Sequence, residues 1–454
     1  MPLRIPLPPS LRDMQALRTL GVWRLLLQAL LTGLVSGAVI GLFRLAYTAI
    51  NGMLTTQIRA HDLSDPLAAG CVIAFLLSMG LLSWLLLRLE PLVSGSGIPQ
   101  TELALAGRLP FPWLRILWVK FVATLVSLSG GLSLGREGPC IQMGAAVGCG
   151  LGHVWHGAAA QQMPRFLVGG SVAGLTAAFG APVAGLCFAF EEMRVLLAAP
   201  MLLFTAVAAA GAWFVVDVIL GFGLVFPFRH LEVLRPEQCW IILPVGLLMG
   251  LLGVAYNALL LRLTVAADRC PFLPRLVRSM LPFVFAGLLL YVYPQVLVGL
   301  GPDTLSLEDF PLELAPLVLL LGVKILFSCL SFASGVAGGL LMPMLLIGAL
   351  AGTCGASGLL SLGCIQPQQT GVILCVCMAG LFAATVRAPL TGAALLLEMT
   401  GALYSAPVIV TAALLAALVA SRLGSKPVYD SLKERILQQG RERESDGAQV
   451  NSAV

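Results

Sequence analysis

The side chains best placed for chemistry lie in three short segments that interrupt otherwise apolar sequence. They are Gly95-Ser96-Gly97-Ile98-Pro99, Gly135-Arg136-Glu137-Gly138-Pro139 and Gly339-Leu340-Leu341-Met342-Pro343. Glycine and proline interrupt helices, and each proline suits the first turn of the helix that follows. The first N–H groups of a helix have no partner within it and favour anions. Three such helix starts in one apolar chain predict a pathway for an anion.

Arg136 and Glu137 are ionisable residues with apolar sequence on both sides. Ionisable residues within a membrane are costly and therefore indicate function, although an internal ion pair joining two helices is the structural alternative. Glu137 is expected at a helix N-terminus, where its ionised form is favoured. A mobile anion would compete for the same N–H groups, and protonation would release the side chain. Glu137 is therefore interpreted as a gate and a proton carrier.

Glu191 and Glu192 close a long uncharged run that begins at Phe166. Adjacent residues on a helix point about 100° apart, so the two carboxyl groups face different surroundings. Glu192 is a candidate for proton uptake from the cytoplasm. An ordinary solvated helix end beside Arg194 is the equally weighted alternative.

Two hydroxyl groups could also contact an anion. Ser96 lies between two glycines and could donate to an anion, but it could equally cap the helix that contains Pro99. Tyr429 follows Lys426-Pro427 and could point into a pore, although tyrosine is common at membrane interfaces. The cysteines and histidines lack the spacing of a metal site, so neither a metal nor a cofactor is predicted.

Composition places these residues in a membrane protein. The chain is 58% hydrophobic and 11% charged, with a mean hydropathy of +0.95. Between Ile325 and Ser421 the only charged residues are Arg387 and Glu398, and a membrane helix needs roughly 20 apolar residues. Several spans and short loops account for nearly the whole length. The net charge of +5 comes without a basic aromatic patch, so nucleic acid is not an expected partner.

The chain also resembles itself, which predicts an internal repeat. An offset of 204 superposes Lys120 on Lys324 and matches several glycines and a proline: Gly131 with Gly335, Gly135 with Gly339, Pro139 with Pro343, Gly144 with Gly348 and Gly148 with Gly352. An offset of 207 superposes Pro182 on Pro389 and Glu191 on Glu398, which predicts a role for Glu191 that is common to both halves. Glu192 has no such counterpart, because it falls on Met399. Transporters built from repeats place their site on discontinuous helices where the repeats meet. The residues alone leave open whether the repeat is parallel or inverted.

The charge distribution sets the expected domain boundaries and orientation. Residues 1–24 form a basic N-terminal segment, 25–432 the membrane domain, with halves of roughly 25–225 and 235–432, and 433–454 a short tail. Basic residues flank the first and last apolar runs, which favours a cytoplasmic location for both termini of a multi-pass protein of the inner membrane.

Taken together, these segments resemble the CLC family of chloride channels and proton-coupled chloride transporters, of the prokaryotic type without regulatory domains. The resemblance runs from about Gly95 to about Tyr429 and rests on GSGIP, GREGP, GGLLMP and KPVY in that order. It implies an all-α polytopic membrane protein, with two inverted-topology repeats of tilted and discontinuous helices. It also implies a homodimer in membrane lipid, with one pore per subunit.

The resemblance assigns roles to individual residues. The selectivity filter would lie in Gly95–Pro99, Gly135–Pro139 and Gly339–Pro343, with Gly97, Ile98 and Gly138 among the anion-binding positions. Chloride would be held by the hydroxyls of Ser96 and Tyr429 and by the amides of Leu340 and Leu341. Glu137 would be the external gate and Glu192 the internal proton residue, while Lys120 and Arg136 would lie near the pathway.

These residues favour an electrogenic antiporter that exchanges chloride for protons across the cytoplasmic membrane. A passive chloride channel of the same fold, gated by voltage or pH, is the alternative. An enzyme is not expected, because a serine hydrolase built on Ser96 needs a base and every histidine lies outside the motifs. Leu341 and Gln100 depart from the family pattern, which usually has phenylalanine and an acid there. Leu341 removes an aromatic wall of the pathway and is expected to alter transport rate and gating.

Overall fold

The computed structural model describes residues 21–60, 66–156, 163–195, 198–228, 231–270, 274–292 and 313–452. Within these ranges the chain is helical, and its only β-structure is a pair of isolated bridges. Eight helices of the described chain are long and apolar enough to cross a membrane. The predicted all-α polytopic membrane fold is therefore confirmed. Most of the predicted segment 1–24 lies outside the described residues.

The helices follow one another in two similar series. The first series is α2 (Val22–Ala60), α3 (Pro66–Leu89), η1 (Pro91–Val93), α4 (Ile98–Leu105), α5 (Trp113–Ser129), α6 (Glu137–His156), α7 (Met163–Phe179), α8 (Pro182–Glu191), α9 (Ala199–Trp213) and η2 (Phe214–Ile219). The second is η3 (Pro236–Ile241), α10 (Ile242–Arg269), α11 (Arg275–Val292), α12 (Leu314–Ala333), α13 (Leu341–Ser361), η7 (Pro367–Gln369), α14 (Thr370–Val386), α15 (Pro389–Thr400), η8 (Leu403–Ser405) and α16 (Ala406–Arg422). The tail helix α17 (Val428–Ser452) follows, and the expected domain boundary between 432 and 433 falls inside it.

Glycines bring consecutive helices into backbone contact at matching places in the two series. A β-carbon on Gly144 of α6 would lie 2.2 Å from the carbonyl oxygen of Gly170 on α7. A β-carbon on the matched Gly348 of α13 would lie 2.7 Å from the Cα of Met378 on α14. The high glycine content of the chain therefore allows close helix packing, as expected where helices associate in lipid.

Gly144→Ala is expected to destabilise the protein, because the new methyl group meets the Gly170 carbonyl in a packed core. Overpacking of this kind costs about 1–3 kcal/mol, which outweighs the helix propensity gained from alanine. The matched control is Gly355→Ala on α13, where a β-carbon would meet nothing within 4 Å. Thermal unfolding in detergent should show a lower midpoint for Gly144→Ala only. Equal midpoints for the two variants would contradict the packing argument.

The second and third breaks pair with each other as a two-fold arrangement. The Gly135 amide donates to the Gly339 carbonyl at 2.7 Å, and the Gly339 amide donates to the Gly135 carbonyl at 2.6 Å. The offset of 204 superposes these two residues, so equivalent positions form an antiparallel bridge with each other. A reciprocal pair of equivalent residues defines a local two-fold axis. This geometry accords with inverted rather than parallel repeats.

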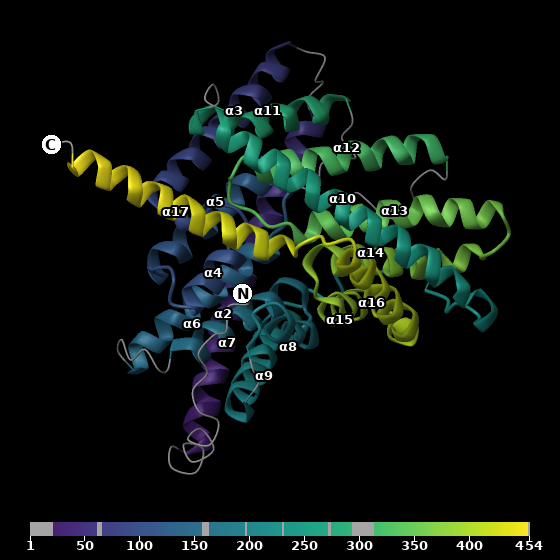
Figure 1. Cartoon of the computed structure of the whole chain (residues 1–454), viewed down its shortest axis with the longest axis horizontal. Coiled ribbons are helices and arrows are strands. Elements are labelled where there is room, and N and C mark those ends of the chain that lie inside the picture. The colour runs from purple at the N-terminus through teal and green to yellow at the C-terminus, as the bar shows by residue number, and fades with distance from the viewer. Residues whose placement is uncertain are drawn as a thin grey trace.

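A second reciprocal contact joins α8 to α15, which lie side by side in Figure 1. Glu191, at the end of α8, accepts hydrogen bonds from the amides of Leu390 and Thr391 at 3.0 and 2.7 Å. Glu398, near the end of α15, accepts from the amides of Val183 and Ala184 at 3.0 and 2.8 Å. Each carboxylate therefore caps the N-terminus of the other repeat's helix. The role common to both halves that the sequence predicted for Glu191 is thus confirmed as helix capping.

Loss of either cap is expected to weaken the contact between the repeats. In Glu191→Gln and Glu398→Gln one carboxylate oxygen becomes an amide nitrogen, which cannot accept the second amide hydrogen bond. Each change should destabilise the protein by about 1 kcal/mol, the typical cost of a lost N-cap. Glu237→Gln, at an exposed position in η3, is the control. The cap variants should unfold at similar and lowered temperatures, and midpoints equal to that of the control would argue against the capping role.

The tail helix α17 crosses the centre of the molecule, and its C-terminal end extends beyond the other helices in this view (Figure 1, yellow). Its first turn contains Val428 and Tyr429, both fully buried. The helix contacts α4 and α14 through this buried end. The start of α17 is therefore part of the buried interior of the protein, whereas its later turns are polar.

Candidate functional site

The three breaks that the sequence singled out meet at one place. The Gly95 amide donates to the carbonyl of Val336 at 3.1 Å, and the Gly338 amide donates to the Gly95 carbonyl at 3.0 Å. The bridge between Gly135 and Gly339 adds the remaining break to the same cluster. Convergence of the segments, on which the anion hypothesis depends, is therefore confirmed.

Each break leads directly into a helix. α4 begins at Ile98, α6 at Glu137 and α13 at Leu341, and the proline of each motif lies in the first turn. The first amides of these helices have no partner within the helix, so three positively polarised helix ends point toward the cluster. Such an arrangement is suited to hold an anion without any cationic side chain.

Lys120 fixes the backbone that leads into the first break. Its side chain is fully buried on α5, and its ammonium group donates to the carbonyls of Val93 and Gly95 at 2.8 and 2.7 Å. Gln100, which stands where the family often has an acid, donates through Nε2 to the Ser94 carbonyl at 2.8 Å. These contacts hold the turn from residue 93 to 97 in place. Lys120 therefore acts on the loop carbonyls rather than as a direct anion ligand.

Glu137 occupies the N-terminus of a helix from the other repeat as well as that of its own. Its side chain is fully buried, and Oε2 accepts a hydrogen bond from the Met342 amide of α13 at 3.3 Å. Oε1 has no hydrogen-bond partner among the described residues. The carboxylate thus lies at the point where α6 and α13 begin, which is where the sequence analysis expected an anion to compete with it.

Arg136 does not form the ion pair that was the structural alternative for this motif. In the part of the chain that the structure describes, no ion pair within 4.0 Å joins it to Glu137 or to another acid. Its Nε is buried and lacks a hydrogen-bond partner there. The guanidinium therefore contributes positive charge near Glu137 without forming an ion pair with its carboxylate.

Ser96 and Tyr429 bring two hydroxyl groups to the other side of the cluster. Ser96 is 2% exposed and Tyr429 is fully buried. The hydroxyls face each other, yet neither completes a hydrogen bond of normal geometry within the described chain. Ser96 does not cap α4, because Gly97 takes the N-cap position without any side-chain hydrogen bond. The capping alternative for Ser96 is therefore wrong, and its hydroxyl is available to a ligand.

Close approach of the backbone explains the glycines of these motifs. A β-carbon on Gly138 would lie 2.2 Å from the Ser96 hydroxyl, and one on Gly97 would lie 2.3 Å from Oε1 of Gln142. Gly97 also adopts φ +91°, a conformation that suits glycine. Glycine at these positions therefore lets the start of α6 approach the first break closely enough for both to contact one ion.

Leu340 and Leu341 contribute to the cluster mainly through their backbones. Leu340 takes the N-cap position of α13 and Leu341 its first helical position, and both side chains are buried. Their amides point along the start of α13, beside the Met342 amide that holds Glu137. Substitution of the side chain at 341 leaves these backbone donors in place, so a leucine keeps the amides that the sequence predicts as anion ligands.

Glu192 lies apart from this cluster, at the end of α8, and is 4% exposed. The solvated helix end, one of the two alternatives for Glu192, is therefore wrong. The residue faces the start of α17 together with Glu102 of α4, which the sequence analysis did not single out. The signal for Glu102 was present, because it is an acid within the short buried helix that follows the first break.

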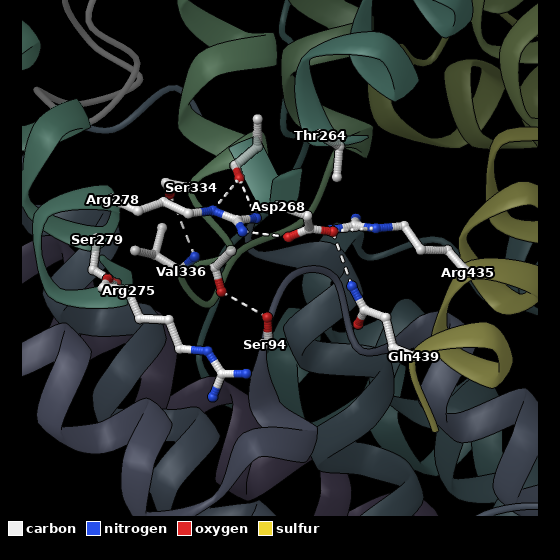
Figure 2. A network of polar contacts seen from close by, with 12 residues as sticks. Ser94, Thr264, Asp268, Arg275, Arg278, Ser279, Ser334, Val336, Arg435 and Gln439 are labelled. Carbon is white, nitrogen blue, oxygen red and sulfur yellow. Dashed lines mark hydrogen bonds and ion pairs between the residues drawn. The ribbon is translucent and has the colours of Figure 1, made fainter. Parts of the chain in front are cut away.

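Figure 2 shows a polar network that fixes the later turns of α17. Asp268, at the end of α10, accepts hydrogen bonds from Arg278 on α11 and from Arg435 and Gln439 on α17. The Nε of Arg435 and the Nε2 of Gln439 each lie 2.8 Å from Oδ2 of Asp268. One carboxylate therefore joins the tail helix to both neighbouring helices.

The same network extends to the loop before α13. Arg278 donates through Nε to the carbonyl of Ala333 at 2.9 Å, at the C-terminus of α12 where a cation is favoured. Beside it, the Ser94 hydroxyl donates to the Gly335 carbonyl at 2.7 Å. These two hydrogen bonds fix the beginning of the loop from residue 334 to 340, which leads into the start of α13.

Comparison with known proteins gives a consistent result. The family described as "Voltage gated chloride channel" matches residues 78–421. The chain is 35% identical over 437 residues to the H(+)/Cl(-) exchange transporter ClcA of Vibrio parahaemolyticus, covering 93% of this chain and 91% of the relative. It is 34% identical over 436 residues to the H(+)/Cl(-) exchange transporter ClcA of Vibrio cholerae, covering 92% and 91%.

Solved structures agree with the sequence comparisons. A slow cyanobacterial Cl-/H+ antiporter superposes with a TM-score of 0.85 and 30% identity, over 91% of this chain and 98% of that chain. The likeness therefore extends over nearly all of both chains.

Proposed function

Since the chain belongs to the voltage gated chloride channel family, we propose that it is an electrogenic antiporter, which exchanges chloride for protons across the membrane. The observation that carries the proposal is the position of Glu137. Its buried carboxylate accepts from the Met342 amide, where the starts of α6 and α13 meet. The relatives named as H(+)/Cl(-) exchange transporters support the same function.

Chloride is held in this proposal by hydroxyls and backbone amides. Ser96 and Tyr429 donate their buried hydroxyl groups, and the amides of Leu340 and Leu341 donate from the start of α13. Gly138 and Ile98 place two further helix starts around the ion. The halide needs no full countercharge, because the converging helix ends supply partial positive charge.

Glu137 and chloride compete for the α13 amides. When ionised, the carboxylate accepts from the Met342 amide and excludes the anion from that position. When protonated, it loses its negative charge, releases the amide and carries a proton away from the site. The α13 amides hold either the Glu137 carboxylate or chloride, but not both at once. Chloride movement is therefore linked to protonation of Glu137.

Glu192 supplies protons from the other side. It is nearly fully buried at the end of α8 and lies near the start of α17, close enough to Tyr429 for its charge to act on the phenol. A carboxyl in that place transfers protons between the aqueous phase and the interior. A passive channel has no need of such a group, so Glu192 is the residue that favours exchange over conduction.

The setting of this transport cycle is also part of the proposal. The protein is a homodimer in the lipid of the inner membrane, with one pore per subunit and both termini cytoplasmic. Exposed apolar side chains on α8, α9 and α16, among them Phe190, Leu202 and Leu418, suit contact with lipid or with a second subunit.

The test is a paired measurement of chloride and proton movement in proteoliposomes. An outward chloride gradient should drive protons inward against their own gradient, and the reversal potential should depend on both ions. A reversal potential fixed at the chloride equilibrium value, whatever the pH gradient, would establish a passive channel instead.

A further inference from the structure

Charged side chains from three elements meet where α17 begins. Glu102 comes from α4, Glu192 and Arg194 from the end of α8, and Asp430 and Lys433 from α17. The side chains of Glu102 and Lys433 are 8% and 11% exposed. This cluster is separate from the gate at Glu137. Glu102, Glu192 and Lys433 are buried within it, whereas Arg194 and Asp430 lie at its solvent-facing side.

A chain of ion pairs connects the members of the cluster. Lys433 forms an ion pair with Oε2 of Glu102 and lies 2.7 Å from Oδ1 of Asp430. Oδ2 of Asp430 in turn accepts from Arg194 at 2.5 Å. Lys433 therefore joins the tail helix to α4, over a separation of 331 residues in sequence.

Glu102 and Glu192 are buried neighbours in this cluster, and each carboxyl group acts electrostatically on the other. Ionised carboxylates only accept hydrogen bonds, so two carboxyl groups can bond to each other only when one carries a proton. Like charges in a buried site also disfavour ionisation of both groups. The three carboxylates and two cations of the cluster leave one negative charge, which one bound proton neutralises.

We propose that Glu102 and Glu192 hold a single proton between them, and that Lys433 is a positioning residue that sets how tightly the pair holds it. Oε1 of Glu102 and Oε1 of Glu192 are both buried and have no hydrogen-bond partner in the described chain. Each residue is less than a tenth exposed, so these oxygens are places for a proton rather than for bulk water. The inference rests on the proposed proton coupling, and it identifies Lys433 as the residue that sets the pH at which the pair takes up its proton.

Asp430 does not compete for this proton. Burial alone would raise the pKa of Asp430, but hydrogen bonds and charge from Lys433 and Arg194 hold it below the ordinary value. Burial would likewise lower the pKa of Lys433, but Glu102 and Asp430 hold it above the ordinary value. Both residues lie on α17, outside the candidate membrane spans. The surroundings therefore favour the ionised forms of Asp430 and Lys433, which leaves Glu102 and Glu192 as the groups that share the proton.

The surrounding backbone keeps these groups in place. Arg194 adopts φ +52°, a left-handed conformation that is unfavourable for a non-glycine residue. Its bond to Asp430 offsets that cost and draws the end of α8 toward α17. Beyond Lys433, Arg435 and Gln439 attach α17 to Asp268 (Figure 2). The segment of α17 that carries Lys433 is therefore attached on both sides of this residue.

The experiment titrates the shared proton directly. The background is purified Glu137→Gln protein, which lacks the carboxyl group of the gate. Its infrared spectrum should contain a band from a protonated carboxyl group that disappears when Glu192→Gln is added. This band measures the proton held by Glu102 and Glu192. Adding Lys433→Met instead removes the cation, so the midpoint of this band should rise by about one to three pH units. Adding Glu102→Gln removes the neighbouring negative charge and supplies an amide donor, so the midpoint should fall. Lys433→Arg keeps the charge and should restore the midpoint of the parent protein.

Lys426→Met is the matched control, because Lys426 pairs with Glu434 at a largely exposed position on the same side of the tail. It should leave the midpoint unchanged, and chloride flux should show that each variant is folded. Midpoints that coincide in Lys433→Met, Glu102→Gln and the control overturn the inference, even if the parent protein exchanges chloride for protons. If the midpoint rises in Lys433→Met and falls in Glu102→Gln but the parent protein moves no protons, the shared proton is established and the proposed antiport is refuted.

Discussion

Glu137→Ala is expected to abolish chloride-driven proton movement while chloride flux persists and becomes insensitive to pH. The variant removes the carboxylate that accepts from the Met342 amide, and no other acid contacts the start of α13 in the described chain. Protons then have no carrier through this part of the pathway, so proton flux should fall at least about a hundredfold, as for loss of a proton-transferring group. Paired chloride and pH electrodes on proteoliposomes measure both fluxes.

Chloride binding gives a second measure of the same change. Without the competing carboxylate, chloride should bind more tightly and raise the unfolding temperature at lower concentrations than it does for the parent protein. Ligand at a hundred times its dissociation constant stabilises by about 2.7 kcal/mol. Glu137→Gln, which keeps the shape of the protonated side chain, should also lose coupling. Coupled proton movement in either variant would remove Glu137 from the mechanism.

Glu192→Gln is expected to separate the two fluxes in a different way. Glutamine keeps the size of the side chain at this buried position but cannot take up a proton, so proton flux should fall by about a hundredfold. Chloride flux should remain and should keep its pH dependence, because the gate at Glu137 is untouched. Retained pH sensitivity distinguishes this variant from Glu137→Ala.

Glu191→Gln provides the neighbouring control for this result. Glu191 caps α15 and has no part in the proposed proton transfer. Its substitution should therefore lower the unfolding temperature but leave the ratio of proton to chloride flux unchanged. Proton flux in Glu192→Gln equal to that of the parent protein would contradict the role of Glu192. It would also favour the passive channel.

The sequence predicted the site largely because backbone chemistry is local. A glycine and a proline at fixed spacing end one helix and begin the next, whatever the rest of the fold does. The breaks at Gly95, Gly135 and Gly339 could therefore be located from their own segments alone. The repeat then predicted that equivalent positions would share a role, as Glu191 and Glu398 do in capping each other's helices.

Side-chain partners could not be predicted in the same way. Lys433 and Glu102 are far apart in sequence, and nothing in either segment specifies the other. An ion pair of Arg136 with Glu137 is a local expectation that the fold overrides, because the Met342 amide holds the carboxylate instead. The segment around Glu192 is equally compatible with a solvated helix end, because the part of α17 that covers this residue is distant in the sequence.

The reciprocal bridge between Gly135 and Gly339 has a consequence for directionality. A backbone with two-fold symmetry looks the same from either face of the membrane. By itself it would therefore not favour transport in one direction over the other. The register of the repeat places Leu341 opposite Glu137 and Met399 opposite Glu192. The two repeats therefore differ at these two positions, although their backbones are related by symmetry. Each difference gives one face of the membrane a carboxyl group that the other face lacks, and this asymmetry lets the protein handle protons differently at its two faces.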